Sequence, residues 1–95
     1  MGVMLTIENQ QTGWVTWHYV RVELSSPGIL TCEASVTNVS ANSPACIVKV
    51  ELNGDDSEQV EFRFWLQAGK SEVVRLKQAT KSGAGTVRAI DIDEE

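Results

Sequence analysis

The chain has 95 residues and a formal net charge of −5, with 13 acidic residues against eight basic ones. This length allows a single domain, expected over residues 1–95, and excludes a two-domain enzyme. With 42% hydrophobic and 22% charged residues the composition is that of a folded protein, and the acidic balance argues against nonspecific binding to nucleic acid or to an anionic membrane surface.

The N-terminal segment Met1–Asn9 carries no basic stretch followed by a long apolar one. No secretory signal is therefore predicted in the chain as given. No stretch approaches the ~20 apolar residues needed to cross a bilayer. We expect a cytoplasmic protein, or a domain cut from a longer one.

Seven stretches rich in Val, Ile, Thr, Phe and Trp alternate with six breaks rich in Gly, Asn and Ser, the first break being Asn9–Gly13. Residues of the first kind favour strands, and those of the second kind favour turns. No stretch has helical spacing of apolar residues over three turns. The predicted strands are Val3–Glu8, Trp14–Leu24, Ile29–Asn38, Ala45–Leu52, Glu58–Leu66, Glu72–Gln78 and Thr86–Asp93.

The second predicted strand, Trp14–Leu24, has two apolar sets that fall on opposite faces: Val15, Trp17 and Tyr19, then Val20, Val22 and Leu24. Alternation normally keeps one set on one face. A bulge near His18–Tyr19, or a strand that passes between sheets, would explain the change. The strand is also long, so we expect part of it to project with unpaired backbone groups that a partner strand or a second copy could pair, with Arg21 opposite Glu23.

The third predicted strand, Ile29–Asn38, is expected to be half-buried, because four apolar side chains share one face: Leu30, Cys32, Ala34 and Val36. Cys46 falls on the apolar face of the next strand. The spacing of the two cysteines matches no CxxC metal or redox site. We predict two buried free thiols that pack as small hydrophobic residues, with a disulfide as the alternative.

The fourth and fifth predicted strands form a hairpin. If Asn53–Ser57 is its loop, the apolar pairs across it are Val50–Val60, Val48–Phe62 and Cys46–Phe64, and Lys49 faces Glu61 on the other side. A slip of one residue would destroy both agreements, so this register is predicted. Arg63 and Trp65 then project from the outer, polar face.

Seven strands at this spacing, with polar outer faces, predict an all-β fold: an Ig-like antiparallel β-sandwich of about seven strands. The stretch from Ile29 to Leu76 resembles bacterial Ig-like domains of the CARDB and FxLYD type. The resemblance rests on the Val-x-Asn step Val36-Thr37-Asn38, the alternating strand Ile47–Leu52 and the turn Leu66-Gln67-Ala68-Gly69-Lys70-Ser71. It covers about half the chain and implies an adhesion, spacer or scaffold module without catalytic residues.

A fainter resemblance is to the chagasin-like inhibitors of cysteine proteases. It is carried by Asn9–Trp14 and by Gly83-Ala84-Gly85, while the proline and the Arg-Pro-Trp motif of that family are missing. This resemblance implies a small protease or host-enzyme inhibitor of phage or bacterial origin as an alternative function.

Catalytic and metal-binding patterns are not evident. The chain has one histidine, His18, between Trp17 and Tyr19, where a packing or surface role is expected rather than a general base. His18, Cys32 and Cys46 have no recognised zinc spacing. The acidic clusters lack the ligand spacing of a calcium loop, and no phosphate-binding loop is present. We therefore expect no enzyme, no metal and no cofactor.

Three tryptophans in 95 residues are the feature that folding explains least. Trp14 and Trp17 project from opposite faces of one predicted strand, so at least one should face outward unless loops cover both. Exposed tryptophans flanked by polar groups often anchor protein interfaces and also hold sugar rings. The predicted binding residues are Trp14, Trp17, Tyr19, Arg63 and Trp65.

The function predicted from these residues is a non-enzymatic protein-interaction or assembly module that binds through an edge strand or an exposed tryptophan patch. A protein partner or self-association is expected, and no nucleic acid or membrane. The alternatives are a carbohydrate-binding module and the small inhibitor named above.

Overall fold

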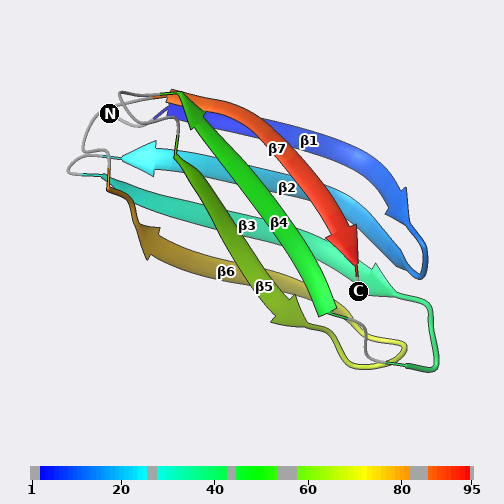
Figure 1. The fold of residues 1–95 in the computed structure, drawn as a ribbon. Helices are drawn as coiled ribbons and strands as arrows, with labels where there is room; N and C mark the ends of the chain where they lie inside the picture. The colour runs from blue at the N-terminus through cyan, green and yellow to red at the C-terminus, as the bar shows by residue number, and fades with distance from the viewer. Residues whose placement is uncertain (1–2, 26–27, 43–44, 54–57, 82–85, 95) are drawn as a thin grey trace.

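The computed structural model describes residues 3–25, 28–42, 45–53, 58–81 and 86–94 (Figure 1). Within these ranges every regular element is a strand, as predicted. The strands are β1 (Val3–Thr12), β2 (Val15–Ser25), β3 (Ile29–Asn38), β4 (Ala45–Asn53), β5 (Gln59–Trp65), β6 (Ser71–Ala79) and β7 (Thr86–Glu94). Of the predicted hairpin loop Asn53–Ser57, Asn53 is the last residue of β4, and residues 54–57 lie outside the described residues, as do residues 83–85.

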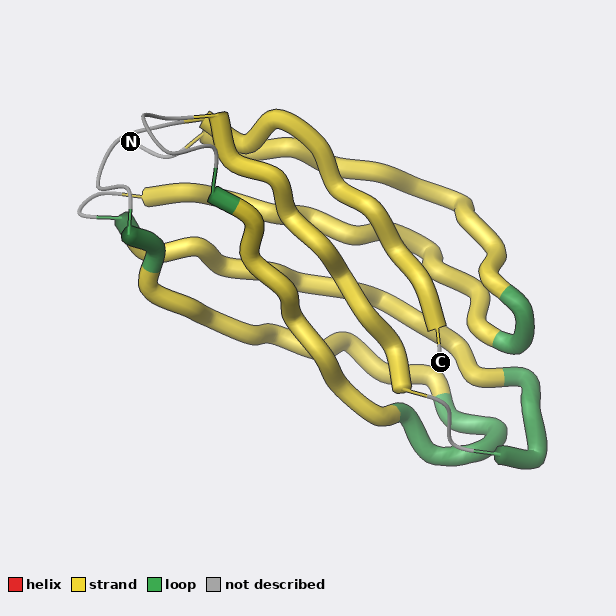
Figure 2. Tube along the Cα trace, viewed as in Figure 1, coloured by secondary structure: helices red, strands yellow, loops and turns green. Residues whose placement is uncertain are grey.

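The strands form two antiparallel sheets that pack face to face, which confirms the predicted β-sandwich (Figure 2). The larger sheet has the order β1-β2-β3-β6 and the smaller one β5-β4-β7. The chain changes sheets between β3 and β4, between β5 and β6 and between β6 and β7. The pairs β3–β6 and β4–β7 join strands that are not consecutive in the chain.

The register of the β4–β5 hairpin is the predicted one. Val50 pairs with Val60, Val48 with Phe62, Cys46 with Phe64 and Lys49 with Glu61. The backbone N–H of Leu52 donates to the carbonyl oxygen of Glu58 at 2.8 Å, which carries the pairing to the end of the ladder. Side chains along β5 alternate strictly between exposed and buried.

A bulge lies in β2 where the sequence predicted one. The pairing of β2 with β3 shifts between Trp17 and Tyr19, so His18 is the extra residue. This shift keeps Trp17 and Val20 on the same buried face. Tyr19 was predicted to share the face of Val15 and Trp17, but because the bulge intervenes it projects from the outer face.

The prediction that part of the strand Trp14–Leu24 projects beyond its neighbours with unpaired backbone groups is wrong. The strand pairs with β1 from Val15 to Leu24 and with β3 from Val15 to Ser25. Both sides of its backbone are therefore used inside the sheet. Its length is explained by two long neighbours rather than by a projecting end.

The predicted break at Asn9–Gly13 is also wrong, because β1 continues to Thr12 and pairs there with Val15. Asn9 has a positive φ of 54° opposite the bulge of β2, a conformation that asparagine tolerates better than most residues. The turn consists of Gly13 and Trp14. Gly13 has a positive φ of 37°, a conformation that glycine adopts without strain, and a Cβ there would make the end of the Glu94 side chain move away.

The core lies between the two sheets. Its largest fully buried side chain is Trp17, which meets Phe64 of the opposite sheet edge to face, with 6.0 Å between ring centroids. Cys32 and Cys46 are free and buried, as predicted. Burial raises the pKa of the Cys32 thiol to about 12 and that of Cys46 to about 11, with a smaller contribution from Glu94 at Cys46.

The two sides of the sandwich differ. On one side β7 lies against β1 and β2, so the edges of both sheets are close together (Figure 1). On the other side the edge strands are β5 and β6, each paired with one neighbour. We call this second side the open edge.

Candidate functional site

Trp65 and Arg63 project from the outer face of β5, as the hairpin register predicted. Trp65 is 63% exposed, although it sits at the end of a well-paired strand opposite Ala45. The Arg63 guanidinium is 3.3 Å from the carboxylate of Glu61 on the same face. A large aromatic side chain is thus held in solvent next to charged groups.

The turn after Trp65 is fixed by buried contacts on both sides. Leu66 is fully buried, the N–H of Lys70 donates to the carbonyl oxygen of Gln67 at 3.1 Å, and Gly69 has a positive φ of 69°. Glycine adopts that backbone conformation without strain. The polypeptide therefore reverses within a few residues and enters β6.

Asn38, a buried residue at the end of β3, binds this turn. Its side-chain Nδ2 donates to the carbonyl oxygen of Leu66 at 3.0 Å and to that of Asn42 at 2.8 Å. Its Oδ1 accepts the N–H of Ser40 at 2.9 Å. Its own backbone N–H donates to the carbonyl oxygen of Lys70, also at 2.9 Å.

A pocket of about 460 Å³ opens between the end of β5 and the beginning of β6. We call it the Trp65 pocket, and it is lined by Trp65, Gln67, Lys70, Ser71 and Glu72. A ligand in this pocket can thus contact five kinds of group: an indole ring, an ammonium group, a carboxylate, an amide and a hydroxyl. Such a mixture favours recognition of a polar partner that has one flat apolar group.

Trp65 was predicted as a binding residue, but the other four lining residues were not, because the sequence assigned them only to a turn and the start of a strand. The sequence did contain one indication of a site there: this turn directly follows a tryptophan predicted to be exposed. What the sequence did not indicate is that Asn38 brings the end of β3 against that turn.

The other predicted binding residues do not join the Trp65 pocket. Trp17 is fully buried and is therefore not available to a partner. Trp14 is 59% exposed in the β1–β2 turn, where its N–H donates to Oε1 of Glu94 at 2.7 Å and its carbonyl oxygen accepts the N–H of Val39. Trp14 thus lies in a separate turn, attached to the same end of β3.

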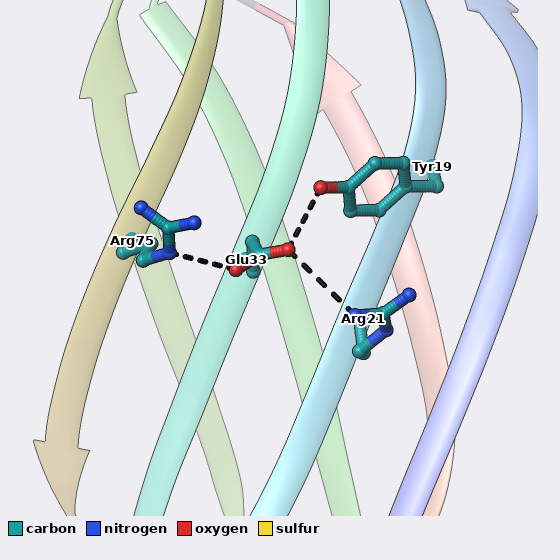
Figure 3. A network of polar contacts seen from close by, with 4 residues as sticks. All are labelled: Tyr19, Arg21, Glu33 and Arg75. Atoms are coloured by element: carbon teal, nitrogen blue, oxygen red, sulfur yellow. Dashed lines mark hydrogen bonds and ion pairs between the residues drawn. The ribbon is translucent and has the colours of Figure 1, made fainter.

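Tyr19 belongs to a polar network on the outer face of the larger sheet (Figure 3). Its hydroxyl donates to Oε2 of Glu33 at 2.7 Å, and Nε of Arg75 donates to Oε1 at the same distance. Arg21 lies 3.8 Å from Oε2 of Glu33 and over the Tyr19 ring, 5.3 Å from its centroid. Because these groups satisfy one another, this face offers a partner fewer free polar groups than the Trp65 pocket does.

The network shifts two ionisations. The hydrogen bond from Tyr19, followed by that from Arg75, lowers the pKa of the Glu33 carboxyl. The hydrogen bond to Glu33 raises the pKa of the Tyr19 hydroxyl. Both shifts favour a charged carboxylate beside a neutral phenol at neutral pH.

No group of three or more His, Cys, Asp or Glu side chains that could hold a metal ion is found in the described part of the chain. His18 is exposed, and its Nε2 is 2.8 Å from Oγ1 of Thr37. In the same residues no helix is long and apolar enough to cross a membrane. Comparisons with protein-family models, with curated proteins and with solved structures give no match to this chain.

The different burial of two tryptophans gives the first prediction. Trp65→Ala should leave the free energy of unfolding close to that of the wild type, because the side chain is mostly in solvent. Trp17→Ala removes the largest buried side chain and should cost ~3–5 kcal/mol of unfolding free energy. Urea denaturation of both variants measures this, and a large loss of stability in Trp65→Ala would remove Trp65 from any binding surface.

The Glu33 network gives a prediction on pH. A carboxyl whose pKa is lowered in the folded state stabilises the protein at neutral pH, and that contribution is lost as the pH falls through the lowered pKa. Glu33→Gln should therefore be less stable than the wild type at neutral pH, and the difference should shrink on acidification. Urea denaturation between about pH 7 and pH 3 measures the difference.

Glu51→Gln is the matched control. Glu51 lies in the smaller sheet, and its ion pair there with Arg88, at 3.6 Å, is longer than the contact of 2.7 Å between Glu33 and Arg75. A constant stability difference between wild type and Glu33→Gln across the pH range would contradict the assignment.

Proposed function

We propose that this chain is a non-enzymatic protein-binding module whose contact surface is the Trp65 pocket at the open edge of the sandwich. The observation that carries the proposal is a tryptophan that is 63% exposed at a rigid strand end beside an open pocket. Tryptophan is among the residues that contribute most to protein interfaces, usually from a central position with polar groups around it.

The surroundings of Trp65 support this role. The turn that forms the other wall of the pocket is held by buried hydrogen bonds from Asn38, so little order has to be gained on binding. A preformed surface loses less conformational entropy when a partner docks. The polar lining residues supply hydrogen bonds that orient the partner.

The location of the surface differs from the one expected for self-association. Both sides of β2 are paired in the sheet, whereas β5 and β6 each have one side that no strand of the described ranges pairs with. If a partner binds by pairing with an edge strand, it would therefore pair with β5 or β6, the strands that border the Trp65 pocket, and not with β2. The resemblance to CARDB and FxLYD domains stays a proposal, and it agrees with a binding or scaffold role.

A carbohydrate is the second candidate ligand. One tryptophan beside Gln67, Glu72 and Ser71 could stack on a sugar ring and hydrogen-bond its hydroxyls. No feature of the described residues supports the inhibitor alternative. Residues 9–12, which were predicted as an inhibitor-like loop, belong to β1, and residues 83–85 lie outside the described residues.

The third prediction compares two exposed tryptophans. Immobilised wild-type chain, Trp65→Ala and Trp14→Ala should be exposed to lysate of the source cells, and the retained proteins identified. We expect at least one protein to be retained by the wild type and by Trp14→Ala and lost from Trp65→Ala. Trp14→Ala is the control because Trp14 is similarly exposed but lies in another turn.

Retention that is equal in all three, with Trp65→Ala folded, would contradict the proposal. Titration with a panel of glycans, monitored by tryptophan fluorescence, distinguishes the carbohydrate alternative from the protein-binding function. A saturable fluorescence change that is lost in Trp65→Ala would assign the pocket to a sugar instead.

A further inference from the structure

The charges of this protein are segregated. Five of its eight basic residues lie between Arg63 and Lys81, where Glu72 is the one acidic residue. The other twelve acidic residues lie elsewhere in a chain whose net charge is −5. The positively charged segment comprises the end of β5, the turn and all of β6, so it covers part of the open edge, whereas Glu61 lies earlier on β5.

The strand β6 is the exposed part of that segment. It pairs with β3 on one side, and within the described residues no strand pairs with its other side. Arg75 and Lys77 project outward. Val74 and Leu76 project toward the core but stay partly exposed, so apolar surface at the end of the core is left uncovered.

We propose that β6 binds an extended acidic segment of a partner protein, which adds as a strand to the free side of β6. In such a segment apolar residues would cover Val74 and Leu76, while the alternating acidic residues would face Lys77 and also Arg75, whose guanidinium binds Glu33 of β3 as well. Added strands gain backbone hydrogen bonds from the free edge, and alternate side chains give specificity. This inference rests on the proposed protein-binding function and names the chemistry of the partner.

The segment bound along β6 would reach the Trp65 pocket. Lys70, Ser71 and Glu72 line the pocket and lead into β6. A residue at the end of the added strand would therefore lie next to Trp65, which joins the two surfaces into one.

Positive side chains on an edge strand also hinder unwanted pairing, and here they act against self-association. A two-fold pairing of β6 centred on Arg75 places Arg75 opposite itself, and one centred on Leu76 places Arg75 opposite Lys77. Like charges directly opposite each other are destabilising. A pairing centred on Val74 places neither Arg75 nor Lys77 opposite an acidic residue of the second copy, so a different, acidic chain is the better occupant.

The chain itself contains a strand of the required pattern. In β7 the apolar residues Ile90 and Ile92 alternate with Asp91 and Asp93. That strand is paired with β4 and lies against β1 and β2, so in the folded protein it is not free to serve as the occupant. It does show that an Ile/Asp alternation is compatible with an edge strand of this sandwich.

The test uses synthetic peptides of about ten residues. The probe alternates Ile and Asp and carries two flanking Thr residues for solubility. One control peptide replaces Asp by Lys, a second replaces Ile by Ser, and a third is the probe with alternate backbone nitrogens methylated. Binding is measured by fluorescence anisotropy at low and high salt, and amide hydrogen exchange of the protein locates the site.

We expect the Ile/Asp peptide to bind and the three controls to bind at least about fivefold more weakly, with affinity falling as salt screens the charges. Exchange of amides in β6 should slow on binding. Lys77→Glu should weaken binding by about fivefold or more, and Lys77→Gln by less. Arg88→Glu, which makes the same charge change on β7, should leave the affinity unchanged.

Absence of binding at about 1 mM peptide would overturn the inference, and so would binding that Lys77→Glu does not weaken or that slows exchange elsewhere. If the Ile/Asp peptide fails while a lysate protein still depends on Trp65, the acidic strand is wrong and the protein-binding function stands. Light scattering of the protein alone completes the test, because a dimer whose formation slows hydrogen exchange of amides in β6 would assign the edge to a second copy.

Discussion

The candidate site depends on one buried side-chain amide. Asn38 ends β3, and its donors and acceptor join the loop after β3 to the turn after Trp65. Because the amide is fully buried, its hydrogen bonds are made without competition from water, and a lost partner would leave an unsatisfied polar group inside the protein. The same end of β3 also holds the Trp14 turn through Val39. One strand end thus positions both exposed tryptophan turns.

A second constraint decides which edge is available. The bulge at His18 keeps one face of β2 buried along its whole length. At that end of the larger sheet, β1 is the edge strand, and β7 of the smaller sheet lies against β1 and β2. The chain has no strand left in its described part to cover β6 on the other side. The charge segregation follows the same division, with basic side chains gathered on the uncovered side. The edge at β6 therefore combines a strand side that no described strand pairs with and a group of basic side chains.

Local periodicity was enough to predict much of the fold. The β4–β5 register followed from apolar alternation and one charge pair, and the bulge followed from the change of face in β2. What failed depended on long-range pairing: alternation does not tell a central strand from an edge strand, so β2 was misplaced. The continuation of β1 through Gln10 and Gln11 was missed because polar residues there carry no strand signal.

The site was predicted in the same partial way. Trp65 and Arg63 were found because the hairpin register fixes their face. Trp17 was included because strand periodicity alone does not show which face of β2 packs against the opposite sheet. The link between the two turn motifs was beyond local reasoning, since Asn38 and Leu66 are far apart in the sequence. Hydrogen exchange in Asn38→Ala, with Ser40→Ala as the control for the loop, tests that link most directly. We expect Asn38→Ala to speed hydrogen exchange at the Lys70 amide. Amides in the centre of β2 should exchange faster only by the factor that the overall loss of stability gives. Ser40→Ala should leave the Lys70 amide protected. Unchanged protection of Lys70 in a folded Asn38→Ala variant would contradict that link.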